Sequence, residues 1–135
     1  MEAGEQTERS QKFEARALIQ SQERSFFLIR MDDWGWQAPG GYIEYSETPE
    51  QALNRTLREQ LRAEGASIGR PLMIASRISD SGRHHLAAYY PVELATETIY
   101  PNSEQIRTYG WYTLDTLPAD VGDQLHYILQ KVAGR

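Results

Sequence analysis

The chain of 135 residues contains no cysteine, which excludes a disulfide framework and a thiolate metal site. Basic residues are few: 14 Lys and Arg stand against 19 Asp and Glu, which argues against a protein that binds nucleic-acid backbones. No apolar run approaches the roughly 20 residues of a membrane span, and residues 1–11 are too polar for a secretory signal. These absences predict a cytoplasmic protein that binds neither membranes nor nucleic acid.

The length and the hydrophobic content of 40 % predict one domain with one core. The polar residues 1–12 are expected to form a flexible tail, and residues 13–135 a single domain. Hydrophobic periodicity predicts strands at 13–20, 26–31, 36–38, 71–79, 84–92 and 109–114, and helices at 49–64 and 119–132. This order predicts an α/β (α+β) fold, an α/β/α sandwich with a mixed β-sheet between helices.

The first of these helices has a clear start and stop. Thr48 is a good N-cap, Pro49 suits the first helical position and Gln51 completes a capping box. Gly65 is the expected C-terminal stop. Three- and four-residue spacing predicts one buried stripe, made of Ala52, Leu53, Thr56, Leu57 and Leu61.

The stretch that contains this helix carries a recognisable motif. It places a glycine pair after a short apolar strand, then a carboxylate, then an amphipathic helix with an arginine and a glutamate. It resembles the Nudix box, here Gly41 to Arg62, the signature of enzymes that hydrolyse a nucleoside diphosphate linked to another moiety. The positions that match are Gly41, Glu47, Arg55, Leu57 and Glu59. The resemblance implies the same α/β/α architecture, with a Nudix-like domain over nearly the whole chain.

Three positions of the box depart from the family pattern. Thr56 and Gln60 stand where the family has glutamates, and Arg62 stands where it has a glycine. Because Arg62 replaces the glycine that ends the family helix, this helix is expected to run about one turn further, to Gly65.

A second register of the box is open. It aligns Arg58 and Glu59 with the Arg-Glu pair of the family, and Gly65 with the glycine. This register places Arg62 at a glutamate position and loses the pairing of Glu47 with the box arginine. The first register is therefore preferred.

The resemblance implies water activated by Mg²⁺ (or Mn²⁺) that box glutamates and a backbone carbonyl hold. Mg²⁺ prefers a few carboxylates together with waters and substrate phosphates. Among the box glutamates that hold metal only Glu59 remains, and the carbonyl of Gly40 is the family-type backbone ligand. Glu104 lies in a late loop where many family members supply another acidic residue; a solvated loop glutamate is the alternative. The resemblance thus assigns catalysis to Glu59 and Glu104 and metal binding to Glu59 and Gly40, with weak binding expected because each lost carboxylate removes Coulombic attraction.

Glu47 and Arg55 hold a different role in the family, where the equivalent pair braces the loop onto the helix. An ordinary surface ion pair is the alternative, with a contribution of about 1 kcal/mol or less. His84 and His85 are adjacent on a predicted strand and point to opposite faces, so a two-histidine metal site is not expected.

Aromatic and basic residues near the glycine turn are candidates for binding a nucleotide-type small molecule. Aromatic rings stack on bases, and arginine pairs with phosphates. Packing explains the aromatic residues equally well. The candidates for substrate binding are Arg30, Trp34, Trp36 and Tyr45.

Three functions remain open at this stage. The preferred one is a metal-dependent Nudix hydrolase with a reduced metal site. The missing glutamates motivate a second, a catalytically inactive Nudix-fold protein that binds a nucleotide or nucleotide sugar. The third is a protein–protein interaction module, and a homodimer through an exposed strand or the last helix is compatible with any of them.

Overall fold

The structure, a computed structural model, describes residues 11–31, 35–96 and 98–134. Within these ranges the chain forms eight strands and two helices. Neither helix is long and apolar enough to cross a membrane. The elements are β1 (Gln11–Ile19), β2 (Phe26–Met31), β3 (Gly35–Gln37), β4 (Gly40–Tyr42), α2 (Pro49–Leu61), β5 (Ser67–Ile68), β6 (Met73–Ile78), β7 (His84–Glu93), β8 (Thr108–Tyr112) and α3 (Asp123–Ala133).

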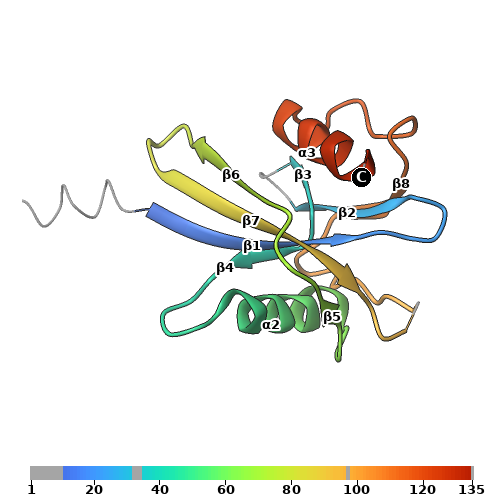
Figure 1. Ribbon diagram of the computed structural model, residues 1–135, viewed down its shortest axis with the longest axis horizontal. Helices are drawn as coiled ribbons and strands as arrows, with labels where there is room; N and C mark the ends of the chain where they lie inside the picture. Colours follow the sequence, from blue (N-terminus) through green and yellow to red (C-terminus); the bar gives the residue numbers. More distant parts are fainter. Residues whose placement is uncertain (1–10, 32–34, 97, 135) are drawn as a thin grey trace, which may run out of the picture.

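The strands form two sheets (Figure 1). In the larger one, β1 pairs in parallel with β7 and antiparallel with β4, and both β5 and β6 pair antiparallel with β7. In the smaller one, β2 lies between β3 and β8, with antiparallel pairing on both sides. Residues of β1 pack into clusters on both faces of the sheet, so side chains on either face of this strand can be buried.

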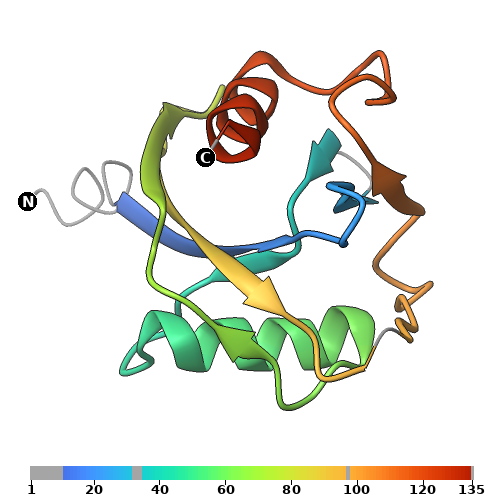
Figure 2. The same cartoon turned by 45° about the vertical axis from the view of Figure 1, so that its right-hand side comes forward.

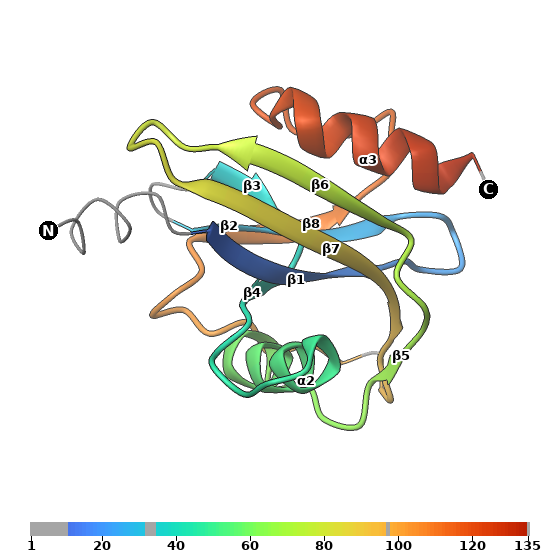
Figure 3. The same cartoon turned by 60° about the vertical axis from the view of Figure 1, so that its left-hand side comes forward.

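The two helices cover opposite sides of β1 and β7, as Figure 2 and Figure 3 show from two further directions. On one side, Leu53, Leu57 and Leu61 of α2 pack against Ala15, Ala17 and Ile19 of β1. On the other side, Leu125, Ile128 and Leu129 of α3 pack in a cluster that contains Leu18 of β1. The predicted α/β/α sandwich with a mixed sheet is therefore confirmed.

The start of α2 is as predicted, but its end is not. The Thr48 hydroxyl accepts a hydrogen bond from the Gln51 amide at 3.1 Å, and the Gln51 side chain accepts one from the Thr48 amide at 2.9 Å. The helix ends at Leu61 rather than near Gly65, so the expected extra turn is wrong. The reason is that Arg62 takes the left-handed conformation with φ 56°, which normally favours glycine, and so ends the helix without one.

Other elements differ from expectation in detail. Phe13, the first residue of the predicted strand 13–20, is 51 % exposed, whereas Ala15 and Ala17 further along β1 are buried. The last helix begins at Asp123 instead of residue 119, since the preceding residues form a turn in which the Val121 amide donates to the Pro118 carbonyl. The two-residue strand β5 was not expected from the sequence.

Candidate active site

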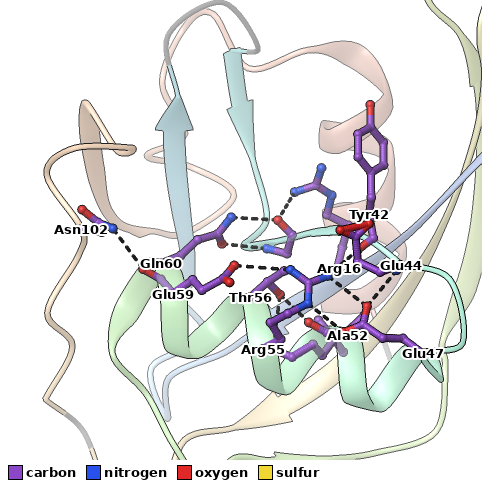
Figure 4. Close-up of polar contacts among 12 residues, drawn as sticks. Arg16, Tyr42, Glu44, Glu47, Ala52, Arg55, Thr56, Glu59, Gln60 and Asn102 are labelled. Atoms are coloured by element: carbon purple, nitrogen blue, oxygen red, sulfur yellow. Dashed lines mark hydrogen bonds and ion pairs between the residues drawn. The ribbon is translucent and has the colours of Figure 1, made fainter.

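The loop before α2 is tied to the helix by Arg55. Its guanidinium donates two hydrogen bonds to the Glu47 carboxylate, at 2.7 and 3.0 Å, and one to the Tyr42 carbonyl at 2.9 Å (Figure 4). The Glu47 carboxylate also accepts a hydrogen bond from the Glu44 amide at 2.8 Å. The hydrogen bond from Arg55 holds the pKa of Glu47 below its usual value. Since Arg55 and not Arg58 faces Glu47, these contacts follow the first register of the box.

The backbone amide and carbonyl of Gly40 are bound by two side chains from different elements. The Gly40 amide donates to Oε1 of Gln60 at 3.0 Å, and Nε2 of Gln60 donates to the Gly40 carbonyl at 2.9 Å. Nη1 of Arg16 also donates to this carbonyl, at 3.0 Å. Gln60 on α2 and Arg16 on β1 therefore meet at Gly40 on β4. Figure 4 shows the side chains of Gln60 and Arg16 pointing toward each other.

Thr56, the second position where a box glutamate is replaced, also turns its oxygen toward the backbone. Its hydroxyl donates to the carbonyls of Ala52 at 3.0 Å and Leu53 at 3.2 Å, and the residue is buried. A threonine in a helix commonly bonds to the preceding turn in this way. The Thr56 hydroxyl therefore points into its own helix.

Glu59 is the box carboxylate that faces solvent. Its side chain is 52 % exposed, and Oε1 lies 3.3 Å from Nη1 of Arg55. The loop that carries Glu104 packs on the end of α2: the Asn102 side chain donates to the Glu59 carbonyl at 3.2 Å, and the Asn102 amide donates to the Gln60 carbonyl at 2.8 Å. Glu104 is exposed, and its amide donates to the Asn102 side chain. Glu59 and Glu104 thus belong to neighbouring segments, but no hydrogen bond joins their side chains.

These contacts do not fit the divalent ion that the box resemblance implies. The Gly40 carbonyl already accepts hydrogen bonds from Arg16 and Gln60, and the oxygens of Thr56 and Gln60 are engaged with the backbone. In the described part of the chain, no three His, Asp or Glu side chains gather into a group that could hold a metal. Mg²⁺ requires several oxygens that are free to coordinate it; of the box positions that the resemblance assigns to metal, Glu59 alone has a carboxylate, and that carboxylate contacts Arg55.

A second polar cluster lies on β1, on the side of the sheet that faces α3. Glu14 is 3 % exposed; it accepts hydrogen bonds from Arg16 at 3.0 and 3.1 Å, and its Oε2 lies 2.8 Å from Nδ1 of His85. Arg77 on β6 reaches the same carboxylate at 3.4 Å. Burial raises the pKa of Glu14, but Arg16, His85 and Arg77 together outweigh it and hold the pKa below its usual value.

Two cavities adjoin this cluster. The larger, about 420 Å³, lies between the sheet and α3, and its lining includes Glu14, Arg16, Trp36, Arg77 and His85. The smaller, about 180 Å³, lies at the glycine turn and shares Glu14 and Arg16 with the first; Gly40, Tyr42 and Gln60 also line it. The ion pair of Glu14 and Arg16 therefore forms part of the wall of both cavities.

The candidates for substrate binding are distributed unevenly. Arg30 forms an ion pair with Asp120, and the indole nitrogen of Trp36 donates to the same carboxylate at 3.0 Å. Trp36 lines the larger cavity, whereas Tyr45 is 98 % exposed and lines neither. Trp34 lies outside the described residues.

Sequence reasoning missed Glu14, Arg16 and Arg77, and it considered His85 only as a metal ligand. In β1, apolar residues alternate with Glu14 and Arg16, and this alternation is typical of a strand whose polar face is exposed to solvent. A signal was nevertheless present, because Leu18 continues the same face as Glu14 and Arg16 and marks it as buried.

Comparisons with known proteins agree with this architecture. The NudC protein of Stutzerimonas stutzeri (strain A1501), an NAD-capped RNA hydrolase, is 35 % identical over 79 residues, which are 58 % of this chain and 27 % of that protein. The chain thus spans little more than a quarter of that relative. A MutT NUDIX hydrolase from Burkholderia pseudomallei superposes with a TM-score of 0.76 at 23 % identity, covering 91 % of this chain and 98 % of the other. A MutT protein from Methanosarcina mazei Go1 superposes with a TM-score of 0.75 at 16 % identity, covering 94 % and 98 %.

At these identities the two solved structures show the fold alone. The family itself is shown by a sequence model described as NUDIX domain, which matches residues 12–132. That range contains the glycine turn, the braced loop, α2, all of α3 except its last residue, and the residues that line the two cavities. The chain belongs to the NUDIX domain family.

Proposed function

We propose that the chain hydrolyses a nucleoside diphosphate that is linked to another moiety. Family membership supports this activity, together with the braced loop that positions α2. The observation that carries the proposal is the larger cavity. Arg16 and Arg77 of the sheet line it, and so does Trp36. Arginine pairs with phosphate oxygens through charge-assisted hydrogen bonds, and an indole ring stacks on a base.

Arg77 is the cavity arginine best suited to meet a phosphate. Its side chain is 39 % exposed and holds Glu14 only at 3.4 Å, whereas Arg16 is buried and engaged by several acceptors. Arg77 thus keeps donors free to neutralise an anionic oxygen. Glu59, the exposed box carboxylate, lies on α2 and lines neither cavity, so its role as the base that accepts a proton from the attacking water rests on the family resemblance.

A second candidate function is nucleotide binding without cleavage. Nudix hydrolases generally use divalent metals. The arrangement of Gly40, Gln60 and Arg16 favours the second function, since it occupies the backbone carbonyl that the family resemblance assigns to metal. This function predicts that a nucleotide binds equally well in Mg²⁺ and in EDTA.

A hydrolysis screen tests the first proposal. The substrates are nucleoside triphosphates, nucleotide sugars, dinucleotide cofactors that include NAD, and dinucleoside polyphosphates, each with Mg²⁺, with Mn²⁺ and with EDTA. We expect turnover that falls about 100-fold in Glu59→Gln. Glu50→Gln, an exposed glutamate on the same helix, is the matched control and should keep full activity. No turnover of any substrate by folded protein that binds ADP would reject the hydrolase and support the binding function.

A further inference from the structure

Both backbone polar groups of Gly40, its amide and its carbonyl, are hydrogen-bonded to side chains. Gln60 bonds to the amide and to the carbonyl at once, which only one orientation of its side-chain amide allows. A carbonyl oxygen has two lone pairs, and at Gly40 the donors are Nε2 of Gln60 and Nη1 of Arg16. An ion at this oxygen would therefore have to displace a buried hydrogen bond.

The charge of Arg16 adds a second obstacle to a cation. Its guanidinium is 3.0 Å from the Gly40 carbonyl and is buried, so its repulsion of a divalent ion is weakly screened. The nearest buried carboxylate, Glu14, is already bound by Arg16, His85 and Arg77. Glu14 thus balances the arginines rather than attracting a metal.

We infer that Arg16 and Gln60 together replace a divalent ion at the Gly40 carbonyl. The chain alone then holds neither Mg²⁺ nor Mn²⁺ at this oxygen. Two hydrogen bonds from α2 and one from β1 link the glycine turn to the rest of the fold, and this link needs no metal. The inference concerns the protein without substrate, so it holds whichever ligand the cavities take.

The isosteric change Gln60→Glu tests this arrangement directly. It replaces the donor Nε2, 2.9 Å from the Gly40 carbonyl, by an oxygen, so that two acceptors face each other. A cation between them would relieve that conflict. The control is Gln51→Glu, the same change at an exposed position of α2, where the side-chain oxygen accepts the capping bond and the side-chain nitrogen bonds to no described residue.

The measurement is thermal unfolding with a titration of Mn²⁺ alone, followed by electron paramagnetic resonance of free Mn²⁺. We expect wild type to show no saturable stabilisation up to about 1 mM Mn²⁺. Gln60→Glu should unfold at lower temperature, recover on adding Mn²⁺, and bind it at least about tenfold more tightly than wild type. Gln51→Glu should behave as wild type.

One result would overturn the inference: wild type stabilised by Mn²⁺ in a saturable manner that Glu59→Gln abolishes. The absence of saturable stabilisation, in wild type and in Glu59→Gln alike, supports the inference. If Gln60→Glu does not fold, the thermal unfolding of wild type and of Glu59→Gln in Mn²⁺ is enough to test the inference. Because no nucleotide is present, the outcome is independent of whether the chain hydrolyses one.

Discussion

The carboxylate of Glu14 lies 2.8 Å from Nδ1 of His85, although 71 positions separate the two residues in the sequence. Both are nearly completely buried, at 3 % and 2 % exposure. They are neighbours because β1 and β7 pair in parallel, with Glu14 opposite Ala87 and Lys12 opposite His85. This contact places a buried carboxylate on the wall that both cavities share.

The first prediction concerns pH. Burial raises the pKa of Glu14, but Arg16, His85 and Arg77 outweigh it, so the folded-state pKa lies below the usual value of 4.5. A group with a lowered folded-state pKa stabilises the fold fully above its unfolded-state pKa. That stabilisation is lost as pH falls through the folded-state pKa. Urea unfolding at a series of pH values should therefore show a decline below about pH 4.5.

Glu14→Gln should remove this contribution and leave the buried Arg16 without its counterion. We expect the free energy of unfolding at pH 7 to fall by about 3 kcal/mol, with a flatter acid limb. Glu64→Gln, an exposed glutamate with no ion pair to described residues, is the control and should retain the wild-type pH profile. Equal profiles for the two variants would contradict the role of Glu14.

The second prediction concerns the link between the loop and α2. Arg55→Lys keeps the charge but loses the planar fork that contacts both oxygens of Glu47 and the Tyr42 carbonyl. We expect faster hydrogen exchange of the Glu44 and Glu47 amides and a lower midpoint in urea. Arg58→Lys, at an exposed position of the same helix, should change neither. An unchanged exchange rate in Arg55→Lys would show that the loop is held by other contacts.

The third prediction concerns Gly40. Its φ of +140° and the close approach of β1 exclude a side chain, because a Cβ would lie 2.2 Å from the Ala15 carbonyl oxygen. Gly40→Ala should lower the free energy of unfolding by about 3 kcal/mol. Gly122→Ala, where a Cβ meets no atom within 4 Å, should lower it by about 1 kcal/mol or less. Urea unfolding of both variants makes the comparison.

The fourth prediction concerns the ligand cavity. Arg77→Gln removes the cavity arginine that has free donors, so the affinity for ADP in calorimetry should fall about tenfold. Arg83→Gln removes the same charge from the exposed hairpin outside the cavity lining and should leave the affinity unchanged. A similar loss in both variants would indicate a general effect of charge rather than a phosphate contact of Arg77.

Local patterns were sufficient to predict most elements of the fold. The capping box of Thr48 and Gln51, the strand 26–31 and the apolar stripe of α2 are encoded by residues a few positions apart. Their conformations depend mainly on backbone propensity and on which face is apolar. The end of α2 escaped this reasoning, because Arg62 takes a backbone conformation that its side chain does not favour.

The contacts of the site also fall into two groups, those that the sequence predicted and those that only the structure shows. The family resemblance predicted the contact of Glu47 with Arg55 and left Glu59 as the remaining metal-binding glutamate of the box. It could not show that Gln60 bonds to the backbone of Gly40, or that Arg16 donates to the same carbonyl. Both contacts depend on how β1, β4 and α2 meet in space.

The sequence by itself determined the family, the order of elements and the loss of the box glutamates. Only the tertiary structure decided what replaced them, namely the bonds from Arg16 and Gln60 to Gly40 and the buried contact of Glu14 with His85. Periodicity along a chain encodes which face of an element is buried. Which side chains meet on that face depends on strand pairing and on packing between distant segments.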